Sequence, residues 1–299
     1  MLYTERHGIR APINKTYCIS IEMYNLLFDC CQKYKKNLTH IFTLNCHHDF
    51  TDSDYIAFNE NGFINRIKIK IPALYKDEYG RICAPSSDDD YDQYALLDYI
   101  EFFAQNMKDI SERWNNERYR NFQTIECLNT INVLKTFQNE INDILIESGL
   151  LYTLTDDKII ERIVENSPLT QEIENQIVDL KEHNLQDLLD EAISLYKSPY
   201  PNANKLAVEK IWDALENLKV YFVDSKKKQA DQKVSDILSA QNEQVARIFE
   251  KELSELGNIG NNYHIRHYND NQVVVTDNRH YDYFFNRCLS LIGLAIQYL

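Results

Sequence analysis

Residues 204–219 read NKLAVEKIWDALENLK, and this stretch decides the class of fold. Apolar side chains recur in it at intervals of three and four residues, the spacing of one buried helix face: Val208, Ile211, Trp212, Leu215 and Leu218. Acidic side chains fall on the next face at the same spacing: Glu209, Asp213 and Glu216. The stretch therefore predicts a helix with one face in a core and a polar face beside it.

The same periodicity continues on both sides of this helix. From Pro168 to the C-terminus it predicts helices over residues 170–181, 185–196, 203–222, 229–256 and 280–299. Short polar connections separate them. We therefore expect residues 167–299 to form an all-α bundle.

The first half mixes two periodicities, so we expect residues 1–166 to form an α+β domain with small β-hairpins. Its helical patterns cover residues 19–34, 94–107 and 132–145. Gly149 follows the last of these helices at a position where glycine commonly ends a helix.

Alternation of polar and apolar residues predicts the hairpins. Within the stretch 40–75, residues 56–71 are expected to form a strand or a hairpin with Asn61-Gly62 as its turn, because Asn-Gly is a strong hairpin signal. The other hairpin covers residues 151–164 with Asp156-Asp157 as its turn. The polar stretch 76–92 between these segments predicts a loop.

Composition narrows the class of protein. The 299 residues include only 7 Gly and 6 Pro, too few for the many tight turns of an all-β sandwich or barrel, so the chain should be mainly α. The 32 Lys and Arg against 46 Asp and Glu give a net charge of −14. This charge disfavours loose, sequence-independent binding to nucleic acid and leaves room for a small local site.

Targeting features favour the cytoplasm. Residues 1–7 are too polar for a signal peptide, and the apolar run 288–299 is too short to span a bilayer and is expected to be a buried core helix. Seven cysteines with no CxxC motif argue against a disulfide framework. We therefore expect a cytoplasmic protein with no membrane partner.

We expect no metal and no cofactor. Residues 46–49 (CHHD) have no second ligand pair at a zinc-like spacing, and the acidic run 88–92 lacks the Gly and the distal Glu of a calcium loop. The motifs GxGxxG, GxxxxGK[ST], GxSxG and HExxH do not occur. Dinucleotide enzymes, nucleotide-driven motors and the common hydrolases therefore lose most of their support.

A polar stretch at residues 256–270 (LGNIGNNYHIRHYND) lies between two predicted helices and is the main candidate site. Arg offers a rigid fork of donors for phosphate, and a His with a near-neutral pKa can take or give a proton. The candidate catalytic residues are Arg266, His267 and His264. The candidate supporting residues are Asn261, Glu209, Asp213 and Asp270.

The polar stretch 256–270 and the acidic face of the 204–219 helix also have a purely structural interpretation. Gly and Asn commonly end helices, and Arg266 can anchor the loop to an acidic helix face. The polar face of the 204–219 helix can be a ladder of surface ion pairs, Glu216 with Lys219 or Asp213 with Lys210. Each such pair is worth only about 0.3–0.5 kcal/mol.

Several segments together resemble abortive-infection proteins of the AbiJ-like group, whose C-terminal helical domain is related to HEPN domains: residues 208–219, 226–228, 258–261, 265–267 and 281–288. Residues 3–8 (YTERHG) and 94–164 resemble the domain that usually precedes it, and the role of that domain, sensor or partner-binding, stays open. The resemblance thus covers most of the chain.

The resemblance implies a bacterial, cytoplasmic protein of anti-phage defence. HEPN domains are helical bundles that commonly form homodimers, and the active ones are toxic, metal-independent ribonucleases in which an Arg and a His face each other across the dimer. By this resemblance Arg266 would stabilise phosphoryl charge, and His267 would handle the proton of the 2′-hydroxyl or of the leaving group. RNA is the implied substrate, and a second copy of the helical domain is the implied partner.

The sequence departs from the HEPN pattern at one point. The usual motif separates its Arg and His by several residues, whereas Arg266 and His267 are adjacent. Two functions therefore stay open: an RNA-cleaving effector, and a non-catalytic sensor or protein-binding module whose Arg-His loop is structural. Whether the chain is an enzyme is likewise open.

Overall fold

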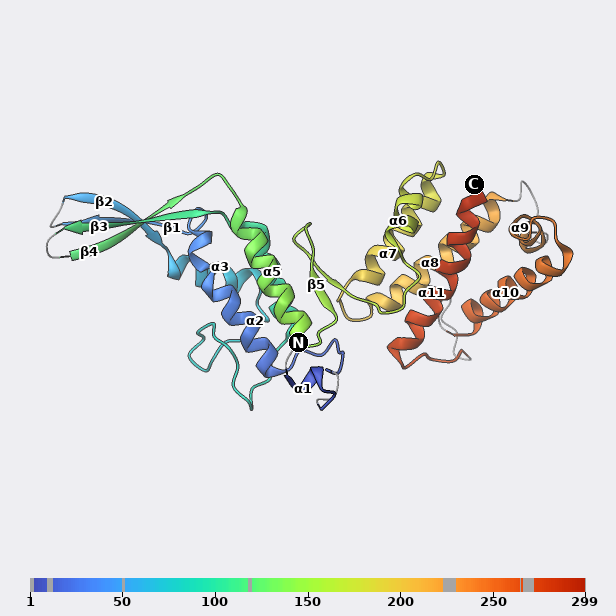
Figure 1. Cartoon of the computed structure of the whole chain (residues 1–299), viewed down its shortest axis with the longest axis horizontal. Coiled ribbons are helices and arrows are strands. Elements are labelled where there is room, and N and C mark those ends of the chain that lie inside the picture. Colours follow the sequence, from blue (N-terminus) through green and yellow to red (C-terminus); the bar gives the residue numbers. More distant parts are fainter. Residues whose placement is uncertain are drawn as a thin grey trace. The chain divides into compact units, whose positions relative to one another are not determined.

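The computed structural model describes residues 3–9, 13–49, 52–117, 120–222, 230–263, 265 and 272–298. The chain is mainly helical with small antiparallel strand pairs (Figure 1). It divides into two compact units, Met1–Ile163 and Val164–Leu299, each with its own hydrophobic core. Separate functions for the two units stay a prediction.

The helices of the first unit are α1 (Tyr3–Arg6), α2 (Ile21–Lys33), α3 (Glu60–Lys70), α4 (Gln93–Asn106) and α5 (Asn132–Glu147), with the 3-10 helix η1 (Lys35–Leu38). Its antiparallel strand pairs are β1 (Thr43–His48) with β2 (Ser53–Phe58), β3 (Ile110–Glu117) with β4 (Arg120–Cys127), and β5 (Tyr152–Leu154) with β6 (Ile160–Arg162). The β1–β2 and β3–β4 pairs lie side by side (Figure 1), and the Ile56 amide of β2 donates to Thr124 Oγ1 of β4 at 3.2 Å.

Aromatic rings fill much of the core of the first unit, in keeping with the many Tyr and Phe residues of the chain. Phe63, Tyr99, Phe103 and Phe137 are all at most 1% exposed. The rings of Tyr99 and Phe103 meet edge to face with centroids 5.0 Å apart, and Phe63 and Phe103 meet in the same way at 6.0 Å. These residues come from α3, α4 and α5, so the ring cluster fixes how those helices pack.

The three helices predicted in the first half are confirmed as α2, α4 and α5. Gly149 follows α5 at a φ of +72°, the left-handed conformation that favours glycine, and the Leu150 amide donates to Leu145 O at 2.8 Å. The pair β3–β4 was not predicted, although it lies next to the helical pattern of α4.

The predicted hairpin around Asn61-Gly62 is wrong. Strand β2 pairs with β1, and α3 begins two residues after β2 ends. The Asn59 side chain caps α3 by accepting from the Gly62 amide at 2.8 Å. Asn and Gly therefore belong to the first turn of a helix here.

Burial along α3 explains why its alternating isoleucines do not form a strand. Phe63 and Ile67, one helical turn apart, are 1% and 0% exposed, whereas Ile69 is 78% exposed. A strand would place Ile67, Ile69 and Ile71 on one face. A helix buries Phe63, Ile67 and Ile71 together, and the core of the first unit contains all three.

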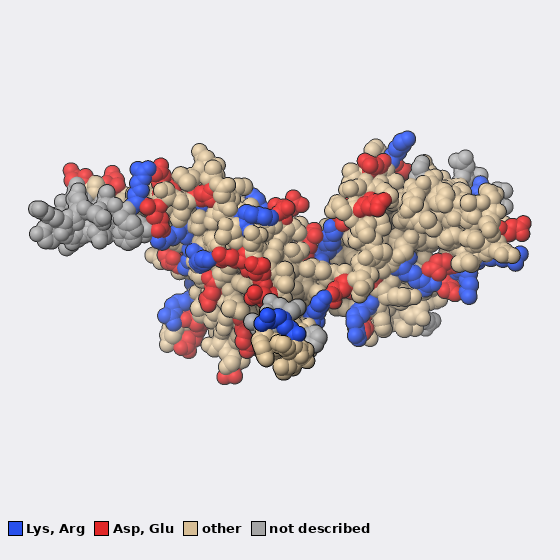
Figure 2. Space-filling view, viewed as in Figure 1, with Lys and Arg blue, Asp and Glu red and all other residues tan. Residues whose placement is uncertain are grey.

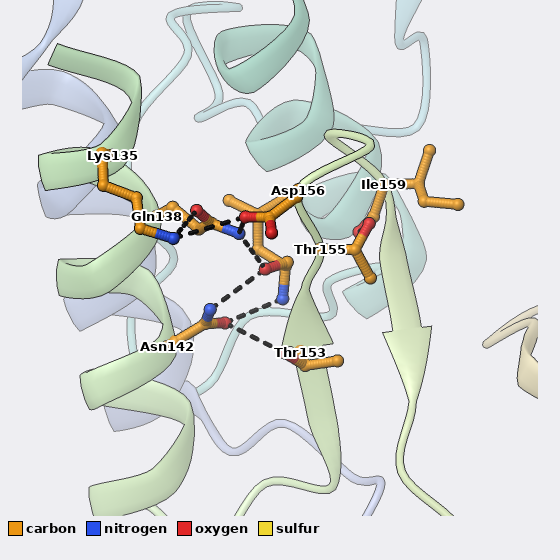
Figure 3. A network of polar contacts seen from close by, with 8 residues as sticks. Lys135, Gln138, Asn142, Thr153, Thr155, Asp156 and Ile159 are labelled. Carbon is orange, nitrogen blue, oxygen red and sulfur yellow. Dashed lines mark hydrogen bonds and ion pairs between the residues drawn. The ribbon is translucent and has the colours of Figure 1, made fainter. Parts of the chain in front are cut away.

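The hairpin predicted at residues 151–164 is confirmed as β5–β6, and side-chain amides fasten it to α5 (Figure 3). Gln138, 7% exposed, donates to Leu154 O and to Asp156 Oδ1, each at 3.0 Å. Asn142 donates to Leu154 O at 3.0 Å and accepts from the Leu154 amide at 2.8 Å. A short hairpin is marginal alone, so these bonds contribute to its stability.

The helices of the second unit are α6 (Gln171–Val178), α7 (His183–Lys197), α8 (Ala203–Tyr221), α9 (Ala230–Leu238), α10 (Glu243–Asn262) and α11 (Asn278–Ala295), followed by η3 (Ile296–Tyr298). The core stripe predicted on α8 is confirmed, since each of its members is at most 1% exposed: Val208, Ile211, Trp212, Leu215 and Leu218. The ring of Tyr196 in α7 stacks on the ring of Phe285 in α11, with the ring centroids 3.8 Å apart. Among its described residues the second unit contains helices and connections but no strand.

The single helix predicted over residues 229–256 is wrong, because two helices occupy this region. Ala240 and Gln241 adopt positive φ angles of 49° and 67° between α9 and α10. Asn242 then caps α10 by accepting from the Gln244 and Val245 amides at 3.0 and 3.3 Å. The break contains no Gly or Pro, so no residue type in the sequence indicates that the helical pattern is interrupted there.

The apolar C-terminal run behaves as the sequence predicts. Leu289, Ile292 and Ala295 of α11 are each fully buried in the core of the second unit. In the part of the chain that the structure describes, no helix has both the length and the apolar character needed to cross a membrane. All seven cysteines are free.

Candidate functional site

Helix α10 extends further along the chain than the predicted end at residue 256, so the first part of the candidate segment 256–270 is helical. α10 continues to Asn262, so Gly257, Gly260 and Asn261 are helical and do not form a loop. Gly257 has open space where a side chain would lie, so this glycine is not required by packing. The connection to α11 therefore begins only at Tyr263, immediately before the residues predicted to be catalytic.

Both ends of this connection are held together. The Val273 amide donates to Asn262 O at 2.9 Å, and the Gln272 side chain donates to Asn261 O. Ile265 is only 2% exposed and belongs to the core of the second unit. The segment is thus closed at its base and anchored near its start by one apolar side chain.

The predicted catalytic residues His264, Arg266 and His267, together with Asp270, lie outside the described residues. The remaining supporting residues are described. Asn261 is exposed in the last turn of α10, Glu209 is half-buried on α8, and Asp213 is exposed on α8. The predicted set as a whole therefore stays a prediction.

Contacts of α8 show which end of the helical unit carries the candidate segment. The Asn204 side chain donates to Asn278 O at 3.4 Å, joining the starts of α8 and α11. About two turns further along α8, the Trp212 indole donates to Leu256 O of α10 at 3.0 Å, inside the core. Glu209 lies on α8 between these two contacts, which join α8 to the start of α11 and to α10.

Ion pairs on α8 confirm one proposed surface pair and replace the other. Glu216 pairs with Lys219 at 3.1 Å, as predicted. Lys210 pairs with Glu191 of α7 at 2.7 Å and not with Asp213. The hydrogen bond to the Glu191 carboxylate raises the pKa of Lys210.

Lys219 is largely buried and pairs with two carboxylates, not only with Glu216. Its side chain is only 9% exposed, and it also pairs with Asp231 in the first turn of α9 at 3.1 Å. One ammonium group thus joins α8 to α9 through two carboxylates. Because the ammonium is buried, its removal should cost more than the loss of an exposed pair.

Replacing Lys219 by Ala should lower the free energy of unfolding by about 2 kcal/mol, because Glu216 and Asp231 lose their shared cation and the core loses an aliphatic stem. Both carboxylates keep part of their solvent contact, which moderates the loss. Denaturant unfolding followed by circular dichroism measures the change. Lys210→Ala, which breaks a more exposed pair on the same helix, should cost at most about 0.5 kcal/mol. Equal losses in the two variants would contradict this assignment.

Neither of the motifs considered for metal binding forms a metal site in the described residues. His47 Nδ1 lies 2.9 Å from Asp54 Oδ1 across the β1–β2 pair, and Asp89 accepts from Tyr75 and from the Ser86 amide. The hydrogen bond from the Tyr75 hydroxyl, and after it the bond from the Ser86 amide, lower the pKa of Asp89. Throughout the described ranges no three His, Cys, Asp or Glu side chains lie close enough together to hold a metal ion.

The sequence did not indicate a second feature of the helical unit, an open cavity of about 760 Å³ beside α10 and α11. Arg287 of α11 lies on its wall and binds Glu252 of α10 through two parallel bonds of 2.7 and 2.9 Å. Arg287 also reaches Glu255 at 2.8 Å. These carboxylates raise the pKa of Arg287, and Arg287 lowers the pKa of Glu255. The available signal was the spacing of Tyr283, Arg287 and Ser290, four and three residues apart on α11, which places them on one helix face.

Comparisons with known proteins bear mainly on the first half of the chain. A family model described as AbiJ N-terminal domain 4 matches residues 1–179, more than half of the chain. The match ends after α6, a helix that packs within the second unit. No curated protein and no solved structure matches the chain.

Proposed function

This chain belongs to the AbiJ-like family of abortive-infection proteins, and from that premise we propose that it protects bacteria from phage by cleaving RNA. The helical unit would be a HEPN-like, metal-independent endoribonuclease. Its reaction would be attack of a 2′-hydroxyl oxygen on the adjacent phosphorus, with departure of the 5′-oxygen. RNA as substrate requires the protein to act in the cytoplasm.

The observation that carries this proposal is the tethered connection between α10 and α11. The bond from the Val273 amide to Asn262 O closes its base, and Ile265, the described residue that precedes Arg266 in the sequence, is buried in the core of the helical unit. Anchoring a segment at its base and at one buried side chain would reduce the entropy lost when a substrate is positioned. Arg266 would stabilise charge on the phosphoryl oxygens, and His267 would carry the proton between the 2′-oxygen and the leaving oxygen.

Charge is compatible with a local RNA site. Acidic and basic side chains are interspersed over the face in view in Figure 2, so no extended basic surface supports a nucleic-acid coat there. The chain as a whole carries −14. Binding should therefore be weak, local and strongly dependent on salt.

The proposed active form is a homodimer through the helical unit, with an Arg and a His from each copy in one cleft. Exposed apolar side chains on α8 and α10 support an interface: Leu206 (43% exposed), Val220 (57%) and Ile248 (66%). Sedimentation of the purified chain should give twice the monomer mass. A monomer at all concentrations that still cleaves RNA would contradict a shared site.

Cleavage by purified protein tests the proposal. The full chain, with and without extract of phage-infected cells, should cut bacterial or phage RNA, whereas His267→Ala should not. If the wild-type chain cuts no RNA under either condition, the enzymatic proposal fails.

A second candidate is a non-catalytic sensor or protein-binding module. Burial of Ile265 favours it, because an anchored loop can serve a purely structural purpose. In that case Arg266→Ala should lower the melting temperature strongly. An unchanged melting temperature with lost protection supports the nuclease.

A further inference from the structure

The cavity beside α10 and α11 combines apolar walls with polar groups held in fixed orientations. Phe249, Leu291 and Leu294 supply the apolar wall, and Tyr283 stands at its rim with 58% of its surface exposed. Its volume of about 760 Å³ lies within the range of small-molecule sites. All of its lining residues belong to the second unit.

Asn286 is oriented on the cavity wall by two hydroxyl groups. Its Oδ1 accepts from Tyr196 Oη at 2.8 Å and from Ser167 Oγ at 2.9 Å. Ser167 itself accepts from the Leu169 amide at 3.2 Å, so its own hydrogen is left for Asn286. Tyr196 is 2% exposed and stacked on Phe285, which makes this arrangement rigid.

This arrangement leaves Asn286 Nδ2 as a donor on the cavity wall. Both bonds of the side chain use Oδ1, and no described residue accepts from Nδ2. A donor whose direction is already fixed loses little entropy when a ligand binds to it. Oxygens of Glu252 on the same wall can accept hydrogen bonds.

Charge at the wall and next to it disfavours anions. Arg287 on the wall is shared by Glu252, also on the wall, and by Glu255, which is not one of the lining residues, so the three groups together carry −1. A phosphate placed here would meet an arginine that is already neutralised and one excess carboxylate. A neutral ligand avoids this repulsion.

We propose that this cavity binds a nucleobase ring, presented by a free nucleoside. A base is flat and neutral, its faces can stack on aromatic side chains such as Phe249 and Tyr283, and its edge carries both donors and acceptors for Asn286 and Glu252. The same ring can also come from an RNA strand, but the backbone phosphates of a strand would lie against the excess carboxylate. The proposal goes beyond nuclease activity and uses none of the residues assigned to it.

Calorimetry on the full chain tests the proposal with adenosine, guanosine, cytidine and uridine as probes. At least one nucleoside should bind, and its 5′-monophosphate and a short single-stranded oligoribonucleotide should each bind at least about tenfold more weakly. Failure of all four nucleosides to bind would overturn the proposal. Tighter binding of the oligoribonucleotide would assign the cavity to RNA and overturn the free-nucleoside form.

Variants identify the site. Asn286→Asp keeps the acceptor for Tyr196 and Ser167 but removes the Nδ2 donor, so nucleoside binding should weaken at least about tenfold with little change in melting temperature. Ser290→Trp should fill the cavity and abolish binding, whereas Ser290→Ala should not. Binding unchanged in Asn286→Asp and Ser290→Trp would place the nucleoside elsewhere. Arg266→Ala should bind nucleoside like the wild type, which separates this result from the nuclease proposal.

Discussion

Replacing Arg266 by Ala should abolish phage protection and lower RNA cleavage by about 100-fold or more. The guanidinium would stabilise charge that develops on the phosphoryl oxygens, and alanine offers nothing in its place. The efficiency of phage plating on cells that express the variant measures protection. It should rise to the value for cells without the protein, while the melting temperature of the variant stays within about 2 °C of the wild type.

Arg279→Ala is the matched control for this variant. Arg279 lies at the start of α11, its side chain is 88% exposed, and it pairs with Asp277 of the same helix start at 2.6 Å. Its loss removes the same charge from the same region of the sequence and should leave protection intact. Equal loss of protection in both variants would indicate a general need for positive charge and contradict a specific role for Arg266.

Replacing Gly149 by Ala should lower the free energy of unfolding by about 3 kcal/mol. Its φ of +72° is strained for any side chain, and an added Cβ would lie 2.6 Å from Ile13 Cγ2 and 2.7 Å from Asn14 O. The second of these atoms belongs to the backbone and cannot turn away. Gly149 O also accepts from the Thr16 amide at 3.0 Å, so the strain would reach the segment that crosses the end of α5.

Gly257→Ala provides the contrast for Gly149→Ala. Gly257 lies inside α10 with nothing within 4 Å of an added Cβ, so alanine there should raise stability by up to about 1 kcal/mol. Denaturant unfolding of the two variants measures both changes. A Gly149→Ala variant as stable as the wild type would show that the end of α5 relaxes more easily than its contacts indicate.

Helices with a regular apolar stripe could be predicted from sequence because burial follows their period. The stripe from Val208 to Leu218 is one example, and the C-terminal helix is another. The pair Asn61-Gly62 misled because the same residues suit a hairpin turn and the first turn of a capped helix. Tertiary packing of Phe63 and Ile67 decided between them.

Helix ends were harder to predict than helix faces. The break at Ala240 and Gln241 uses left-handed backbone at residues that rarely adopt it, so composition gave no warning. In contrast, Gly257 and Gly260 suggested an end of α10 that occurs only after Asn262. Glycine is tolerated inside this helix because Leu253 and Leu256 of α10 lie in the core of the second unit.

The cavity of the second unit could not be predicted from sequence because it joins distant residues. Ser167 and Asn286 are 119 residues apart, and Tyr196 and Asn286 are 90 apart. No local sequence pattern indicates that residues so far apart in the chain lie in contact. The segment with Arg266 and His267 could be singled out from the sequence alone, because these two residues are adjacent and their side chains suit the chemistry of a phosphate site.

RNA cleavage by the purified full chain in excess EDTA tests the central claim most directly, with one RNA and its fully 2′-O-methylated copy as substrates. A metal-independent reaction that uses the 2′-hydroxyl should cut the first and leave 5′-hydroxyl ends, and should leave the second intact. No cleavage of the first RNA, cleavage that stops when EDTA is added, or equal cleavage of both RNAs would contradict the account.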